Sequence, residues 1–284
     1  MAESVVLTEV TDRVAVITLN RPDARNALSR EVLAALPEAI AACDADDAID
    51  VLVLTGADPA FCAGIDLKSL ASGTTASSSR PSSDRSRTDP ARTDRARTAA
   101  ARPEPFAPTR KPLVAAVNGA AVTGGLEVVL ACDFVVASER ARFADTHARV
   151  GIMPGWGLTV RLAEAVGQRR AREMSLTGNF VDARTAYDWG LVNHVVAHEE
   201  LLPYCRALAA DIVSNDQPGV REILATYDAE LALVHDAQLD LESRRSREWM
   251  AGGGGRAEEI ARRREGIVAR GRAQQGNDEQ GERA

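Results

Sequence analysis

The sequence predicts an α/β fold followed by a charged helical region, and two observations carry this prediction. Short runs rich in Val, Ile and Leu recur in the first half of the chain, as they do in buried strands. Segments with helical patterning lie between these runs, and such alternation is typical of α/β proteins. Beyond Gln217 the chain becomes charged and helical in character, so we expect a helical C-terminal region.

The predicted strands and helices alternate along the chain. Strands are expected at residues 14–19, 49–55, 113–117 and 133–137. Ser29 precedes an amphipathic segment, and its hydroxyl is expected to accept from the free N–H groups of the first helical turn. The apolar side chains of this helix recur at helical spacing, at Val32, Leu33, Leu36 and Ile40. A second, apolar helix is expected over residues 124–131.

We expect one core at residues 1–200 and the helical C-terminal region at residues 201–284. Residues 72–109 are rich in Ser, Thr, Arg, Ala and Pro, with almost no large apolar side chains. Such a segment buries too little surface to offset its ordering entropy, so we predict a mobile insertion. A regulatory or partner-binding tail is the alternative. The glycines at 252–255 are expected to break the long helix, before a basic helical stretch at residues 256–272.

Composition limits the class of protein. The chain has 284 residues, is 45% hydrophobic and carries a formal net charge of −7, which argues against a general nucleic-acid-binding role. Its four cysteines form no C-x-x-C pair and have no histidine at metal-ligand spacing, so we expect reduced thiols and no metal site. The sequence shows no signal peptide and no apolar run of about 20 residues, so a cytoplasmic location is expected.

Two glycine-containing segments, residues 60–67 and 115–127, are each patterned as a strand, a tight turn and a helix start. A helix start presents unpaired N–H groups and the positive end of the helix dipole. Two such ends that converge can hold a developing oxyanion, such as the enolate of a thioester. The alternative is two ordinary strand-to-helix turns. Neither segment matches a P-loop or a dinucleotide-binding fingerprint.

These segments resemble those of the crotonase superfamily, the enoyl-CoA hydratases and isomerases. The resemblance covers most of residues 5–200 through several independent blocks in the same order. The blocks are ITLNRP at 17–22, RNAL at 25–28, AFCAGIDL at 60–67, KPLVAAVNG at 111–119, ACD at 131–133, VGIMPG at 150–155, LTG at 176–178 and WGLV at 189–192.

The resemblance implies a spiral of ββα units, with a helical C-terminal trimerisation region and trimers that often pair into hexamers. It implies an oxyanion hole made by the backbone N–H groups of Ile65 and Gly124. Coenzyme A is expected as part of the substrate, and no other cofactor is expected. It is expected to bind at two segments of the chain and near Gly124. These segments contain Ala24, Arg25, Ala63, Ile65, Asp66, Leu67 and Lys68. Arg25, Lys68 and the basic stretch after residue 255 are candidates for the CoA phosphates.

In the hydratases of this family two glutamates act on the water and on the α-proton. Glu127 matches the first position, one helical turn after Gly124. The second position, twenty residues on, is His147, which can act as an acid or base near neutral pH or only fill space. Asp145 would point the same way as His147 in an extended segment, and would orient it or replace the missing carboxylate. Trp156 stands where hydratases have a small residue, and would narrow the acyl pocket.

The sequence therefore predicts a lyase that adds water to a 2-enoyl-CoA thioester, with catalytic residues Glu127 and His147. An enoyl-CoA isomerase, which moves a proton between the α and γ carbons, is the first alternative. Isomerases of the family often place their single glutamate at the second position, which is His147 here, so this alternative is weaker. The second alternative is an acyl-CoA-binding protein with little turnover, suggested by the altered glutamate pair but opposed by the presence of Glu127.

Overall fold

The computed structural model describes residues 4–66 and 104–252, together with residues 266, 268, 269 and 272. Its strands are β1 (Val6–Thr11), β2 (Val14–Leu19), β3 (Val51–Gly56), β4 (Leu113–Val117), β5 (Ala120–Val122), β6 (Phe134–Ser138), β7 (Arg142–Ala144), β8 (Val181–Asp182) and β9 (His194–Val196). Its helices are η1 (Pro22–Ala24), α1 (Arg30–Ala45), α4 (Gly124–Leu130), α5 (His147–Val150), α6 (Leu158–Val166), α7 (Gln168–Thr177), α8 (Ala183–Trp189), η2 (His198–Glu200), α9 (Leu201–Val213) and α10 (Gln217–Ala251).

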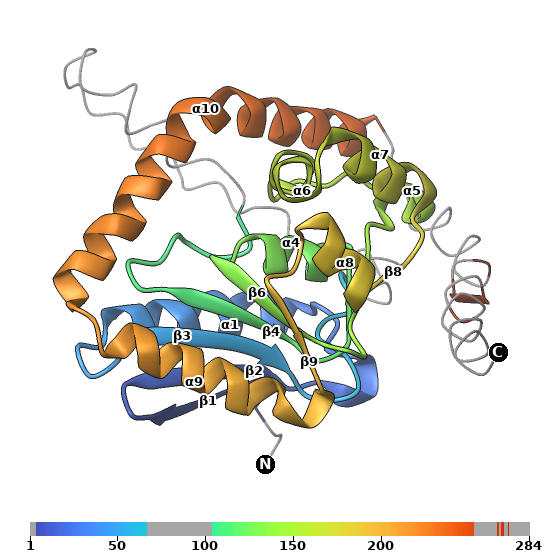
Figure 1. Cartoon of the computed structure of the whole chain (residues 1–284). Coiled ribbons are helices and arrows are strands. Elements are labelled where there is room, and N and C mark those ends of the chain that lie inside the picture. The colour runs from blue at the N-terminus through green and yellow to red at the C-terminus, as the bar shows by residue number, and fades with distance from the viewer. Residues whose placement is uncertain (1–3, 67–103, 253–265, 267, 270–271, 273–284) are drawn as a thin grey trace, which may run out of the picture.

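A six-stranded sheet in the order β1-β2-β3-β4-β6-β9 forms the centre of the fold. Strand β1 is antiparallel to β2, and the other neighbours are parallel. In Figure 1, α9 lies across one face of this sheet and α1 lies behind the other. Because both faces are covered, the inner strands are apolar at nearly every position, as parallel sheets require.

Alternate residues of each strand enter two separate cores. Ile17, Leu54 and Val117 belong to the larger core, which includes the buried face of α1. Val16 and Val53 pack instead against α9. The period of two along each strand thus divides the apolar runs between two layers of helix.

The predicted helix start is confirmed, because the Ser29 side chain accepts from the N–H of Val32. Val32, Leu36 and Ile40 are buried, but Leu33 is 41% exposed, so its expected place on the buried stripe is wrong. The stripe continues through Cys43, and Leu33 lies beside it. The strands predicted at 49–55 and 133–137 begin one or two residues later than expected.

The segment predicted as a mobile insertion, residues 72–109, lies outside the described residues up to position 103. Its last six residues are placed. Phe106 is buried in the larger core, and Glu104 forms an ion pair with Arg161 at 2.8 Å. These residues therefore belong to the packed domain, because one aromatic side chain anchors a stretch whose average composition is polar.

Helix α10 is the predicted long C-terminal helix, which starts at Gln217 as expected and runs for 35 residues. Figure 1 shows it leaving the region of α9 and passing over α6 toward α7 and α5. It ends at Ala251, directly before the first of the four glycines, and most of the basic stretch predicted at residues 256–272 lies outside the described residues. No helix among the described residues is both long and apolar enough to span a membrane.

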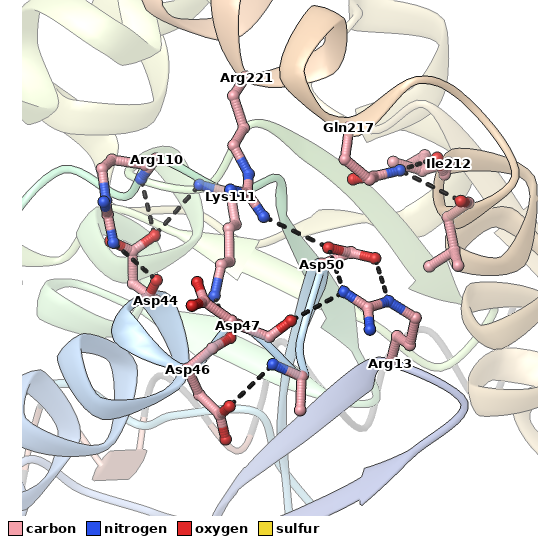
Figure 2. A network of polar contacts seen from close by, with 12 residues as sticks. Arg13, Asp44, Asp46, Asp47, Asp50, Arg110, Lys111, Ile212, Gln217 and Arg221 are labelled. Carbon is pink, nitrogen blue, oxygen red and sulfur yellow. Dashed lines mark hydrogen bonds and ion pairs between the residues drawn. The ribbon is translucent and has the colours of Figure 1, made fainter.

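A polar network joins the amino ends of β2, β3 and β4 to α10 (Figure 2). Asp50, only 2% exposed, accepts from the Arg13 guanidinium and, at 3.3 Å, from Arg221 of α10. The buried Lys111 ammonium donates to two backbone carbonyls at the end of α1, at 2.9 and 2.6 Å. The network lies at the opposite end of the strands from the turns that carry the glycine segments, so it anchors the C-terminal region to the core.

Replacing Asp50 by asparagine is expected to lower the free energy of unfolding by about 2 kcal/mol at neutral pH. Removing one member of a buried ion pair costs about 3–5 kcal/mol, but Arg13 and Arg221 are partly exposed and can regain water. The hydrogen bond and charge of Arg13 lower the pKa of Asp50. The contribution of Asp50 to stability is therefore fully present above its pKa in the unfolded chain. It is lost as pH falls through its lower pKa in the folded protein.

Urea denaturation of the Asp50→Asn variant and the parent at pH 7 and pH 3 measures this contribution. Asp47→Asn is the matched control, because Asp47 is exposed and its hydrogen bond with Arg13 is made by the backbone carbonyl, which the change keeps. Equal stabilities of Asp50→Asn and the parent at pH 7 would show that the network contributes nothing.

Candidate active site

The candidate site lies at the carboxyl edge of a second, three-stranded sheet in the order β5-β7-β8. Strands β5 and β7 are parallel, with Val122 opposite Ala144. Helix α4 begins two residues after β5, and helix α5 begins three residues after β7. Because parallel strands end at the same edge, the first turns of both helices lie next to each other. This arrangement places Glu127 and His147 together.

The AFCAGID segment is attached to the other side of β5. The Cys62 N–H donates to Ala120 O at 2.9 Å, and the Val122 N–H donates to Cys62 O at 2.9 Å. Helix α4 packs directly on this segment, since a Cβ on Gly125 would lie 2.3 Å from the Cys62 carbonyl oxygen. Burial raises the pKa of the Cys62 thiol to about 12, so this cysteine is a packed, protonated side chain.

Gly64 turns the chain so that Ile65 reaches the start of α4. Its φ is +85°, and an added Cβ would lie 2.6 Å from Val122 O, so only glycine fits. The Ile65 side chain lies 3.6 Å from the position that a Cβ on Gly124 would take. The two residues predicted to form an oxyanion hole are therefore neighbours.

The backbone pairing explains why neither of these N–H groups has a backbone partner among residues 4–66 and 104–252. Leu28 pairs with Gly64 O and with the Asp66 N–H, so the intervening Ile65 N–H points away from Leu28. Gly124 is the first residue of α4, and a first-turn N–H has no acceptor within its own helix. No backbone hydrogen bond within the described ranges uses either group.

Glu127 is 2% exposed and points from α4 toward the loop between α5 and α6. Its Oε1 accepts from the backbone N–H of Trp156 at 2.8 Å and of Gly155 at 3.2 Å. Its Oε2 lies 3.5 Å from His147 Nε2. One carboxylate oxygen is thus fixed by two amides, and the other faces the imidazole.

His147 is 3% exposed and lies between two carboxylates. Its Nδ1 is 2.6 Å from Asp145 Oδ1, and its backbone N–H donates to the same oxygen at 3.1 Å. Burial alone lowers the pKa of His147, but Asp145 and Glu127 outweigh it and raise the pKa to about 9. The imidazole is therefore a cation at neutral pH, donating to Asp145 and facing Glu127.

Asp145 contacts and orients His147. The segment between them is not extended, so the expected reason for the contact is wrong. The chain turns after β7, and His147 is already the first residue of α5. Asp145, 1% exposed, meets the ring because its carboxylate folds back over this turn. Burial opposes its ionisation, but hydrogen bonding and the charge of His147 still lower the pKa of Asp145.

Two threonines link the starts of the two helices. Thr123 precedes α4 and Thr146 precedes α5, and their hydroxyl oxygens are 2.5 Å apart. The Thr123 N–H also donates to Ala144 O at 2.9 Å. Sequence reasoning missed this contact, because the two residues are twenty-three positions apart and no short motif joins them.

Trp156 lies beside Gly124, one of the two residues predicted to form the oxyanion hole. Its Cζ3 is 3.5 Å from the position of a Cβ on Gly124, and its ring packs partly against the larger core. The Trp156 carbonyl accepts from Arg161 Nη1 at 2.9 Å. The ring therefore occupies space beside Gly124.

The two segments predicted to bind CoA lie side by side. The Ala63 N–H donates to Arg25 O at 3.0 Å, next to Ala24 at the end of η1. Asp66 forms an ion pair with Arg21 at 3.2 Å, so its carboxylate is committed to the protein. Leu67 and Lys68 lie outside the described residues.

Asn26, which belongs to the RNAL block, holds the loops around these two segments together. It is fully buried with φ of +54°, and its side chain donates to Ala57 O at 2.7 Å and Ala60 O at 2.6 Å. Its Oδ1 accepts from the Arg21 N–H at 2.9 Å. Asparagine tolerates this left-handed backbone conformation better than most residues. An asparagine in a turn is therefore the sequence feature that could have indicated this role.

The arrangement combines two N–H groups that lack a backbone partner in the described part of the chain with a fixed carboxylate and a charged imidazole. Such a set can stabilise an oxyanion and can accept and donate a proton within one site.

Comparison with known proteins agrees with this geometry. Residues 9–252 match the family model described as enoyl-CoA hydratase/isomerase. The chain is 37% identical over 239 residues to a probable peroxisomal enoyl-CoA hydratase 1 of Arabidopsis thaliana, covering 84% of each chain. It is 33% identical over 244 residues to a crotonyl-CoA hydratase of Syntrophomonas wolfei, covering 86% of this chain and 88% of the relative.

A crystal structure of an enoyl-CoA hydratase from Mycobacterium smegmatis has the same fold, with a TM-score of 0.76 and 44% identity. The match covers 88% of this chain and all of that one, 100%. The predicted crotonase-like α/β fold with a helical C-terminal region is thereby confirmed. This chain belongs to the enoyl-CoA hydratase/isomerase family.

Proposed function

We propose that the protein is an enoyl-CoA hydratase that adds water across the double bond of a 2-enoyl-CoA thioester. The observation that carries this proposal is the buried pair of Glu127 and His147, 3.5 Å apart, beside the N–H groups of Ile65 and Gly124, which have no backbone partner among the described residues. Hydration needs a base for water, a donor for the α-carbon and donors for the enolate oxygen, and these groups supply all three.

The N–H groups of Ile65 and Gly124 form the oxyanion hole of the proposed reaction. A thioester oxygen held between them gains negative charge as water attacks the β-carbon. Both groups are backbone atoms fixed by the Cys62 pairing and by the start of α4, so they need no rearrangement to meet that charge. Losing one donor of this kind typically costs about a hundredfold to a thousandfold in kcat.

Glu127 acts as the general base and His147 as the proton donor. Glu127 removes a proton from water, the oxygen bonds to the β-carbon, and the π electrons move to the thioester oxygen. Collapse of the enolate takes a proton from His147 to the α-carbon. Glu127 then returns its proton to His147 across the 3.5 Å contact, which restores both groups. The net change is the addition of one water.

CoA is bound by the paired segments around Ala24, Arg25 and Ala63, and by the backbone of Asp66. The hydrogen bond from Ala63 to Arg25 supports this, because it makes one continuous surface from two segments of the chain. Arg25, at the end of η1, is the candidate partner for a CoA phosphate.

We further propose a homotrimer, or a hexamer made of trimers, assembled through the C-terminal helices. Helix α10 exposes large apolar side chains, with Ile223 at 61%, Tyr227 at 64% and Leu233 at 87% exposure. Such exposure is costly in an isolated chain and is relieved by contact with another copy. The cytoplasm is the proposed location, and the four free thiols are in keeping with a reducing compartment.

A panel of acyl-CoA thioesters tests the function. With crotonyl-CoA and longer 2-enoyl-CoAs, loss of enoyl absorbance and formation of 3-hydroxyacyl-CoA are expected, with short chains preferred because Trp156 narrows the pocket. A 3-enoyl-CoA converted without addition of water would identify an isomerase. Binding of CoA esters with neither reaction at any chain length would contradict the hydratase and leave a binding protein.

A further inference from the structure

One face of α10 lies against the loop that holds Glu127. Leu239, Glu242, Ser246 and Trp249 follow each other at steps of three, four and three, which is the spacing of a single helical face. Their contacts lie between residues 151 and 159: Leu239 beside Gly157, Ser246 beside Gly155, and the Trp249 Nε1 donating to Gly151 O at 3.0 Å. The second half of the C-terminal helix is therefore attached to the active-site loop.

Glu242 makes the strongest of these attachments. It is 6% exposed, and its Oε1 accepts from the Gly157 N–H at 2.6 Å. Its Oε2 accepts from the Thr159 N–H at 2.6 Å and from the Thr159 hydroxyl at 2.5 Å. Hydrogen bonds to an ionised acceptor are stronger than neutral ones, so this contact holds its loop firmly.

The sequence of α6 explains why a distant carboxylate is needed there. The N-cap of α6 is Gly157, with φ of +88° and no side chain to accept from the first turn. Such a start leaves N–H groups without partners and carries the positive end of the helix dipole. Glu242 supplies both the acceptor and the negative charge from another helix, 85 residues along the chain.

The loop fixed by Glu242 is the one that fixes Glu127. The N–H groups of Gly155 and Trp156 bind Glu127 Oε1, and the next N–H along the chain, that of Gly157, binds Glu242. Three consecutive amides are thus shared between two carboxylates. We propose that Glu242 is a positioning residue, which aims the Gly155 and Trp156 amides at Glu127 and so sets the catalytic carboxylate in place.

This inference rests on the proposed function for its catalytic consequence, but the positioning itself is independent of turnover. If Glu242 only stabilised the fold, its loss would lower the melting temperature and leave kcat unchanged at temperatures well below melting. If it positions the loop, its loss lowers kcat and leaves KM unchanged, since the CoA-binding segments lie on η1 and the AFCAGID segment.

The experiment compares Glu242→Gln with Glu248→Gln, a matched change of an exposed carboxylate on the same helix. Glu242→Gln keeps the size of the side chain but offers one acceptor oxygen, and turns an N–H₂ group toward the remaining donors. We expect kcat for crotonyl-CoA to fall by about tenfold to a hundredfold, with KM within about twofold. Glu248→Gln should match the parent.

Hydrogen exchange provides the readout that needs no turnover. Peptide amides at residues 155–157 are expected to exchange about tenfold faster in Glu242→Gln, while the amides of β3 and β4 keep their rates. Two results in Glu242→Gln would overturn the inference: exchange rates at residues 155–157 equal to those of the parent, or a kcat equal to that of an active parent enzyme. If the parent hydrates no enoyl-CoA, the proposed function fails and exchange alone decides the positioning role.

Thr159→Val provides a second variant in case Glu242→Gln does not fold. It removes only the hydroxyl donor to Glu242 and leaves the two backbone contacts in place. The same two effects are expected, each smaller than in Glu242→Gln: faster amide exchange at residues 155–157, and a lower kcat at constant KM. Parent behaviour in both readouts would count against Glu242 as a positioning residue.

Discussion

Replacing Glu127 by glutamine is expected to lower kcat for crotonyl-CoA by about a thousandfold while acyl-CoA binding is retained. The glutamine oxygen can still accept from the Gly155 and Trp156 amides, so the loop keeps its place. The amide cannot take a proton from water, and its N–H₂ group faces His147, which is itself a donor. Steady-state hydration with calorimetric titration of a CoA ester separates turnover from binding.

The matched control is Glu38→Gln, because Glu38 is exposed on α1. It should behave as the parent in both measurements. Unchanged turnover in Glu127→Gln would remove Glu127 from the mechanism. Loss of binding together with turnover would instead mean that the carboxylate shapes the pocket.

Replacing His147 by alanine is expected to lower kcat by about a hundredfold and to remove the alkaline limb of the pH profile. The pKa of His147 is raised to about 9, so the donor is charged below that pH. Parent activity should therefore be level near neutral pH and fall as pH rises through about 9. The ion pairs of His147 stabilise the folded protein with the same pH dependence. Their contribution to the free energy of unfolding is complete below the ordinary histidine pKa and is lost as pH rises through about 9.

The pH dependence of kcat in the parent, His147→Ala and His194→Ala tests this role. His194 is an exposed histidine that packs against Tyr204, so its loss should leave the alkaline limb in place. An alkaline limb that survives in His147→Ala would assign that limb to another group.

Substitution of His147 by glutamate examines whether two carboxylates can replace the carboxylate and imidazole. The single change buries a third acid beside Glu127 and Asp145, and three buried carboxylates cannot all ionise at this spacing. Recovery of activity is therefore expected only when Asp145→Asn accompanies His147→Glu. Recovery by His147→Glu alone would show that Asp145 is not essential to the geometry.

Sequence patterns predicted the long elements because each carries its own signal. Strands β2, β3, β4 and β6 are apolar on both faces, and α1 has a capping serine before a regular stripe. The small sheet was not predicted. Strands β5, β7 and β8 have three residues or fewer, and such lengths show no periodicity. Strand β1 was missed because it is an edge strand, exposed at all but one position.

The site was predicted in part because its residues lie in local motifs. Ile65, Gly124, Glu127 and His147 were identified by their spacing within family blocks, and the structure places all four together. Glu242 was not identified, because its partners Gly157 and Thr159 are more than eighty residues away. A contact between distant segments depends on how helices pack, and no local spacing encodes it. The position of the Trp156 ring likewise depends on the path of the loop between α5 and α6, which the sequence does not reveal.

The contact between Gly125 and Cys62 has a practical consequence for chemical labelling. The thiol in the middle of the AFCAGID segment is fully buried, and its high pKa leaves almost no reactive thiolate at neutral pH. Burial also raises the pKa of the other three cysteines, at positions 43, 132 and 205. Maleimide or iodoacetamide should therefore react slowly with the folded protein, and Cys132, which is only partly buried, should be the first native thiol to react. A single cysteine introduced at an exposed position of α10 would then take up a fluorophore selectively, without removal of any native thiol.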